Sequence, residues 1–375
     1  MCINSINFYD LHAFSQKKPI IIDANNRYTI VSTETENLLI QKVCRFAKWA
    51  FPIVLTYGCA HALQFKIMAK VGFVSLYFLY SLLHSFASNM ILPGPFLSRE
   101  GRTILHANKM AFLSEVEKEK DWEVLNFNLK VDGMKIDGIL VRKKETQTKR
   151  WVLYSGGNAE SYEILSNMGE LLNTFEGNGL FFNYPGIRDS SGPTNKKTLV
   201  KAYQALLRFL EDQNGLGAKE IIGYGYSIGG AVQGEALKGY PLKERIRYYF
   251  IKDRTFATLS QVASKVLFRP AGFFIKRLGW EMNTATSSKQ LSAPEMFIQS
   301  VEKNNGTVSV ISDGVIPKEA SLMHGFLEGE KRGTKTGKYF LGAFAIHCAK
   351  LDYNAVSQLF QKMKKRDPNR FLLST

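Results

Sequence analysis

Residues 225–229 read Gly-Tyr-Ser-Ile-Gly, and their types and spacing could place a nucleophile on a tight turn. A strand-like run, 220–224, precedes them, and a run of small residues typical of a helix, 230–237, follows. A serine on such a turn projects from the edge of a sheet, where a carbonyl carbon can reach its hydroxyl. Glycine two residues away on each side leaves room for the turn. We therefore predict Ser227 as a nucleophile; the alternative is a chance Gly-x-Ser-x-Gly.

A nucleophilic serine needs a base to take its proton. The chain has six histidines, and four of them precede the predicted sheet: His12, His61, His84 and His106. His347 directly follows the last strand-like run, residues 339–345, whereas His324 lies eleven residues after Asp313 with no strand between them. We predict His347 as the general base and interpret His324 as a helix-surface residue.

The base needs an acid that orients it. Asp313 follows a strand-like run and opens the loop 313–317, so it should share an edge of the sheet with Ser227 and His347. Asp253 is the rival acid, because some hydrolases place this residue after an earlier strand.

Two backbone N–H groups are predicted to stabilise an oxyanion. Residues 155–160 read Ser-Gly-Gly-Asn-Ala-Glu after the third strand, and the two glycines allow a sharp turn. We assign the donors to the backbone N–H groups of Asn158 and Ile228; the alternative is an ordinary strand-to-helix turn. The four cysteines form neither a C-x-x-C pair nor a cluster with histidine, so we expect no disulfide framework and a reducing compartment. The predicted serine chemistry implies no metal and no organic cofactor.

The elements around these residues predict an α/β fold. Residues 125–131 and 136–141 flank an Asp-Gly turn signal and form an antiparallel hairpin. Strand-like runs and helix-like runs then alternate to the end of the chain. This order predicts a mostly parallel, twisted sheet with helices on both faces, over residues 98–375.

The N-terminal region, residues 1–97, contains two apolar helical segments, about 49–65 and 71–92, without a charged residue. The second is long enough to cross a bilayer, and five cations flank the pair: Lys42, Arg45, Lys48, Arg99 and Arg102. These features favour membrane insertion or docking on an anionic membrane surface; packing on the following domain is the alternative.

The formal net charge is +16, but no zinc, helix-turn-helix or RNA-binding signature accompanies the scattered cations. We therefore expect no nucleic-acid partner. The N-terminus lacks the pattern of a signal peptide, which favours a cytoplasmic or cytosol-facing, membrane-associated protein.

Together these residues resemble the α/β-hydrolase superfamily of serine hydrolases, from about residue 104 onward. Residues 154–159 are similar to its Y-x-H-G-N-A block, 184–192 to Y-R-G-x-G-x-S-x-G, 253–259 to E-N-T-F-x-S-L and 313–317 to D-x-x-V-P. Gly156 replaces the histidine of the first block, and Arg188 the second glycine of the next.

The set most resembles the monoacylglycerol-lipase and depalmitoylase kind. Residues 183–186 and 312–316 also resemble the chlamydial CHLPS proteins and the SidB-type Legionella effectors. The resemblance implies the α/β-hydrolase fold with the predicted triad, and allows a bacterial effector secreted into a host cell.

Residues 256–292 lie where such folds carry a small cap over the site. Their aromatic content suggests an acyl-chain pocket, with core packing as the alternative. The resulting expectation is a serine hydrolase that cleaves an ester or thioester of an apolar acyl group. The competing hypothesis is a catalytically silent membrane-binding or partner-binding protein with the same fold.

Overall fold

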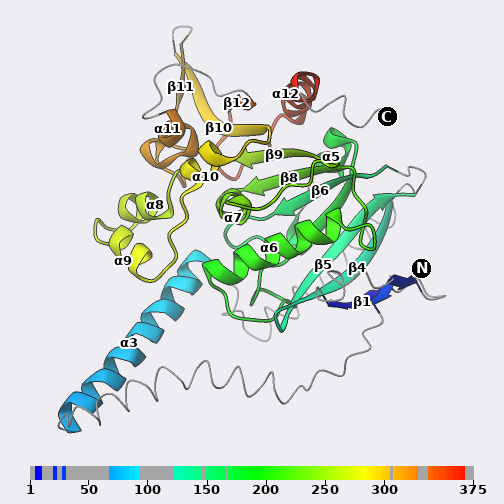
Figure 1. Ribbon diagram of the computed structural model, residues 1–375. Helices are drawn as coiled ribbons and strands as arrows, with labels where there is room; N and C mark the ends of the chain where they lie inside the picture. The colour runs from blue at the N-terminus through cyan, green and yellow to red at the C-terminus, as the bar shows by residue number, and fades with distance from the viewer. Residues whose placement is uncertain are drawn as a thin grey trace.

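The computed structural model describes residues 5–10, 20–22, 28–30, 67–92, 122–144, 148–165, 168–304, 307–327 and 337–367. At its centre is a ten-stranded sheet (Figure 1). In spatial order its strands are β1 (Ser5–Asp10), β4 (Trp122–Val131), β5 (Met134–Lys143), β7 (Asn178–Phe182), β6 (Arg150–Ser155), β8 (Glu220–Tyr226), β9 (Arg247–Asp253), β10 (Glu295–Asn304) and β11 (Thr307–Val310). β12 (Lys338–Ala343) pairs with the other side of β10, and β2 (Ile20–Ile22) with β3 (Tyr28–Ile30) in a separate sheet.

The pairing directions confirm the predicted mostly parallel sheet. The run β7-β6-β8-β9-β10-β12 is parallel throughout, and β1 is parallel to β4. The antiparallel pairs are β4–β5, β5–β7 and β10–β11. Asp132 and Gly133 form the predicted hairpin turn, both with positive φ, 46° and 75°. That geometry matches the right-handed twist of the two flanking strands.

Helices cover both faces of the sheet, as predicted. Successive strand residues alternate between the two cores: Leu153 packs beneath α6 (Lys196–Glu211) and α7 (Ile228–Leu237), whereas Val152 packs beneath α5 (Met168–Phe175) and α12 (Tyr353–Arg366). Strands buried on both faces need apolar residues at consecutive positions, which explains their uninterrupted hydrophobic runs. The short η1 (Tyr162–Ile164) precedes α5.

Three strands near the site share a buried carboxylate. Glu295 on β10 accepts from Lys252 on β9 and from Lys338 on β12, and Ser288 also donates to it. Both charged partners are buried, so each ion must be compensated by this network. The network therefore ties together the strands that precede Asp253, Asp313 and His347.

The region predicted as a cap, residues 256–292, folds into α8 (Leu259–Val266), α9 (Ala271–Arg277) and α10 (Thr284–Gln290). Farther along the chain, η2 (Lys318–Ala320) and α11 (Leu322–Leu327) lie between β11 and β12. Residue Phe256 forms a bridge to Ser321, which joins this second group to the segment that leads from β9 into α8.

The second apolar segment forms a helix, α3 (Ile67–Ile91), which projects away from the sheet (Figure 1). Its C-terminal end is anchored: Ser88 donates to the Thr194 carbonyl at 2.9 Å, and the His84 ring lies 6.2 Å from Trp280. None of the helices in the described ranges combines the length and the apolar character needed to cross a membrane. The first apolar segment, 49–65, and the domain boundary expected at 97 lie outside the described residues.

Candidate active site

Ser227 occupies the turn between β8 and α7. Its φ of 52° and ψ of −122° lie outside the ordinary regions for a side chain with a Cβ, and its N–H donates to the Asp253 carbonyl at 2.9 Å. A Cβ on Gly225 would lie 2.6 Å from the Cα of Gly230, and one on Gly229 would lie 1.9 Å from the Ser155 carbonyl oxygen. Both glycines of the motif are therefore required by backbone contacts at the turn.

The structure brings Ser227, His347 and Asp313 into one hydrogen-bonded chain. The Ser227 Oγ lies 3.0 Å from His347 Nε2, and His347 Nδ1 lies 2.8 Å from Asp313 Oδ2. All three side chains are buried. With Asp313 ionised, His347 Nδ1 carries a hydrogen and donates a hydrogen bond to the carboxylate. Nε2 can therefore accept the proton of Ser227. The arrangement can activate a serine as a nucleophile; the catalytic roles remain predictions.

The strand order brings these groups to one edge of the sheet. β10 continues for four residues, 301–304, beyond its last pair with β12, and these four pair with β11. β11 runs back along β10, so that the Ile311 N–H donates to the Ser300 carbonyl at 3.1 Å. Asp313 follows at the carboxyl edge of the parallel strands. β12 runs parallel to β10 with Ala343 beside Ser300, and it therefore delivers His347 to the same edge.

Hydrogen bonds keep the Asp313 carboxylate charged. Burial alone would raise its pKa, but hydrogen bonds from His347 and from the backbone N–H groups of Ile316 and Val315 lower the pKa below its usual value. The charged form is thus favoured in the folded protein. Its contribution to stability is present at neutral pH and is lost only as the pH falls through the lowered pKa.

The rival residues lie elsewhere. Asp253 accepts from the Tyr224 hydroxyl at 2.8 Å and pairs with Arg254, and it makes no hydrogen bond with His347. His324 lies on α11 and lines a different cavity, and His84 contacts Trp280. His12, His61 and His106 lie outside the described residues. Within the described ranges, no group of three or more metal-binding side chains is suitably placed to hold an ion.

Arg254 holds the loop that carries His347. Its Nη1 donates to the carbonyl oxygens of Ile346 and Ala349, both at 2.7 Å, and its Nε donates to Asp253 at 2.8 Å. Its guanidinium also lies 5.3 Å from the centre of the Tyr226 ring. The Tyr226 hydroxyl in turn donates to the His347 carbonyl at 2.8 Å.

The glycine loop after β6 lies beside the turn. The Gly157 N–H donates to Glu160 at 2.6 Å, and the Tyr184 hydroxyl donates to the Gly156 carbonyl at 3.0 Å. Burial raises the pKa of Glu160 above its usual value, although hydrogen bonds from the Gly157 N–H and the Tyr154 hydroxyl act to lower it. Among the described residues, no hydrogen bond is seen from the N–H group of Asn158 or Ile228, and their role as oxyanion donors stays a prediction.

Sequence analysis missed Arg254, Tyr226, Glu160 and Tyr184 as supporting residues. Arg254 and Tyr226 directly adjoin the rival acid and the nucleophile, which was a usable signal. Their partners are carbonyl groups more than ninety residues away, and no sequence pattern marks such a contact.

The apolar residues of the cap lie in two different environments. Phe256, Ile275 and Trp280 are buried in the main core, which fits the packing alternative. Five others are 46–56 % exposed and do not line a closed acyl pocket: Val266, Leu267, Phe268, Phe273 and Phe274.

Solved structures share this fold. The chain is similar to the esterase Pf2001 of Pyrococcus furiosus in two crystal forms, each with 17 % identity, a TM-score of 0.50 and 66 % of this chain covered, over 93 % and 94 % of the esterase. An alpha-beta hydrolase of Vibrio vulnificus matches with 15 % identity and a TM-score of 0.49, over 72 % of this chain and 95 % of that one. The Pyrococcus matches show the α/β-hydrolase fold.

No curated protein matches the sequence. A family model described as "Chlamydia CHLPS protein (DUF818)" matches residues 48–366. That range includes α3 and all the elements from β4 to α12, but not β1. Because the match spans most of the chain, the chain belongs to the Chlamydia CHLPS protein family (DUF818).

Proposed function

We propose that this protein is a serine hydrolase that cleaves a carboxylic ester or thioester of an apolar acyl group. The observation that carries the proposal is the hydrogen-bonded chain from Ser227 through His347 to Asp313 at a strained strand-to-helix turn. The fold shared with an esterase adds support. The likeness to the monoacylglycerol-lipase and depalmitoylase kind suggests the apolar acyl group.

In the first half-reaction, Ser227 Oγ attacks the acyl carbonyl carbon while its proton passes to His347 Nε2. The carbonyl π electrons move to its oxygen, and the N–H groups of Ile228 and Asn158 stabilise the resulting oxyanion. When the oxyanion collapses, the bond to the alcohol or thiol breaks. His347 returns its proton to that leaving group, and the acyl group stays on Ser227.

In the second half-reaction, water replaces the leaving group. His347 Nε2 takes a proton from the water, whose oxygen attacks the acyl carbon and forms a second oxyanion. Collapse breaks the bond to Ser227 Oγ, which recovers the proton from His347 and releases the carboxylic acid. Asp313 remains charged throughout and stabilises the imidazolium form of His347.

The proposal predicts covalent labelling at Ser227 by a fluorophosphonate probe, which reacts with activated serines. Ser227→Ala and His347→Ala should each lower short-chain ester hydrolysis by several powers of ten, because the triad acts as one unit. Peptide mass spectrometry after labelling identifies the modified serine, and hydrolysis is measured on matched oxygen esters and thioesters.

His324→Ala and Ser357→Ala are the matched controls, since both residues lie on helices and outside the hydrogen-bonded chain. Both controls should keep the parent's rate. Undiminished labelling and hydrolysis by Ser227→Ala would overturn the proposal and favour the catalytically silent alternative.

We also propose that the N-terminal region, residues 42–102, associates with a cytosol-facing anionic membrane. The support is the uncharged sequence of the second apolar segment and the exposure of its large side chains on α3, among them Leu76, Phe78 and Phe86. A membrane surface would bring the catalytic edge close to acyl substrates.

A further inference from the structure

The turn between α8 and α9 presents apolar side chains to solvent. We call residues 259–277 the α8–α9 hairpin. Val266, Leu267 and Phe268 are consecutive at its tip, and each is more than half exposed. Phe273 and Phe274 extend the surface along α9, with their rings 5.8 Å apart. Exposed apolar residues that gather in this way mark an interaction surface.

The charges on the same hairpin are of one sign. Its four cations are all exposed: Lys265, Arg269, Lys276 and Arg277. No acidic residue occurs from 254 to 280. None of the four makes an ion pair in the described part of the chain, and the Arg277 guanidinium lies 5.2 Å from the centre of the Phe273 ring. Glu281, which follows the hairpin, interacts electrostatically with Lys276. The hairpin therefore combines an apolar tip with an excess of positive charge.

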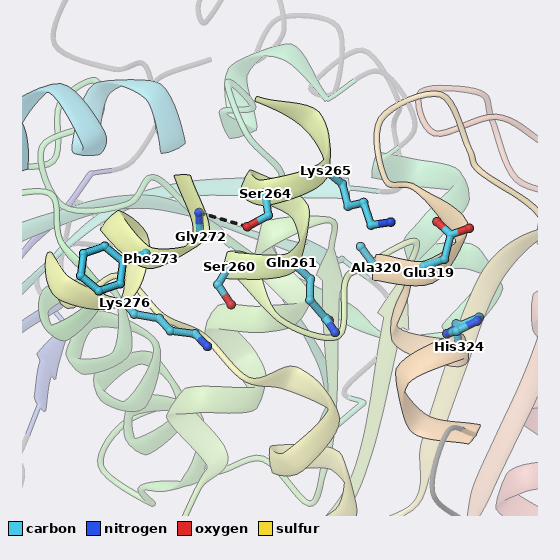
Figure 2. A pocket seen from close by; sticks show the side chains of 10 residues that line it. All are labelled: Ser260, Gln261, Ser264, Lys265, Gly272, Phe273, Lys276, Glu319, Ala320 and His324. Carbon is cyan, nitrogen blue, oxygen red and sulfur yellow. Dashed lines mark hydrogen bonds between the residues drawn. The ribbon is translucent and has the colours of Figure 1, made fainter. Parts of the chain in front are cut away.

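A cavity of about 610 Å³ lies between this hairpin and the segment η2–α11. Figure 2 shows Lys265 extending from α8 toward Glu319, and Lys276 on α9 beside Phe273. Ser260 and Ser264 add hydroxyl groups to the lining. Glu319 is one acid against the two lysines, so the lining is positive overall and suited to an anionic group.

We propose that the α8–α9 hairpin docks on an anionic phospholipid surface. Lipid phosphate groups would meet Lys265 and Lys276 at the mouth of the cavity. Val266, Leu267 and Phe268 would enter the boundary between headgroups and acyl chains. Charge complementarity selects this occupant, because anionic membranes attract clusters of cations and the apolar side chains gain from leaving water.

The hairpin is near the candidate site in the chain and in space. α8 begins shortly after Asp253, at the carboxyl edge of the parallel strands. Trp280, which follows α9, contacts His84 near the C-terminal end of α3. Figure 1 shows α3, α8 and α9 on the same side of the sheet. Docking of the hairpin rests on this surface and not on the proposed hydrolase activity, so binding is tested separately from activity.

The test is sedimentation of the full chain with two kinds of vesicle, phosphatidylcholine alone and phosphatidylcholine partly replaced by phosphatidylglycerol. The protein should partition more strongly onto the anionic vesicles. Lys265→Glu with Lys276→Glu should lower that partition roughly tenfold or more. Phe268→Ser with Phe273→Ser should lower binding to both vesicles, because these side chains supply the apolar contact. All four residues are exposed, so the variants should fold.

The matched control is Lys149→Glu with Lys219→Glu. These exposed lysines precede β6 and β8, at the opposite edge of the sheet, and the change in charge is the same. Equal loss of binding in this control would mean that overall charge, and not the hairpin, governs docking. Parent-like binding by both hairpin variants would also overturn the proposal. So would lipid-independent self-association that the Phe268→Ser with Phe273→Ser variant abolishes, which would assign the surface to a second copy of the chain.

Discussion

Arg254 connects the two sides of the candidate site through one guanidinium group. It pairs with Asp253 at the end of β9 and holds two carbonyl groups that flank His347. A planar fork of donors is needed to bind a carboxylate and two carbonyls at the same time. We therefore regard Arg254 as a positioning residue that fixes the imidazole relative to Ser227.

Replacing this residue should affect turnover more than substrate binding. Arg254→Gln should lower kcat by roughly ten- to a hundredfold, because a small displacement of the base is costly, and should change KM little. Arg254→Lys should recover only part of the loss. Steady-state kinetics on a short ester measure both constants, with Arg142→Lys on β5 as the control. Parent-like kcat in Arg254→Gln would show that the loop holds His347 without it.

At this scale the sequence was informative where chemistry depends on local spacing. Ser227 could be identified because its two glycines lie in the same short segment. Asp313 and His347 could be proposed because each follows a strand-like run. The roles of Tyr184 and Glu160 could not be predicted, because both residues support the glycine loop through contacts that exist only in the folded chain.

The turn between β8 and α7 leaves no room for a side chain at Gly229. A Cβ on Gly229 would collide with the backbone of Ser155 and Gly156, the start of the glycine loop. Gly229→Ala should therefore displace that loop, abolish probe labelling and destabilise the protein by about 1–3 kcal/mol.

Gly234→Ala on the same helix is the matched control. Its Cβ would lie no closer than 3.3 Å to the side chain of Ser287, and alanine favours a helix over glycine. Labelling and chemical denaturation compare the two variants. If Gly229→Ala kept full labelling, the close approach of the two backbones would not be essential.

Among the elements, the sequence prediction lacked β1, which joins the sheet from the N-terminal region, and β11, the hairpin partner of β10. Residues 307–310 alternate between polar and apolar types after an Asn-Gly pair, which is a hairpin signal. β11 is only four residues long, and so short an alternation does not distinguish a strand from an ordinary loop.

At the scale of the whole molecule, α3 stands out among the described helices for the number of its large apolar side chains that are exposed. Eleven of its large apolar side chains are exposed, whereas a helix that is apolar on all sides is usually covered. The fold class was predictable because alternating strands and helices constrain the sheet. The orientation of α3 could not be predicted, because its sequence lacks a polar face that would indicate which side meets water.

The membrane hypothesis predicts that the full chain floats with anionic vesicles in a density gradient. Leu76→Gln, Phe78→Gln and Phe86→Gln together should weaken flotation, because they remove apolar surface that lipid would cover. Matched changes at exposed polar residues of α12, such as Asn354→Gln and Gln358→Asn, serve as the control. A full chain that stays at the bottom as a monodisperse protein, with and without anionic lipid, contradicts the hypothesis.

The late position of β12 has a consequence for the protein during its synthesis. A chain made as far as residue 337 already contains Ser227 and Asp313, but it lacks the strand and loop that deliver His347. On a ribosome, the emerging polypeptide would therefore pass through a long interval in which its serine is present and inert. The hydrolytic centre would be completed only after β12 joins β10, so the order of translation itself would delay activity until the sheet is nearly finished.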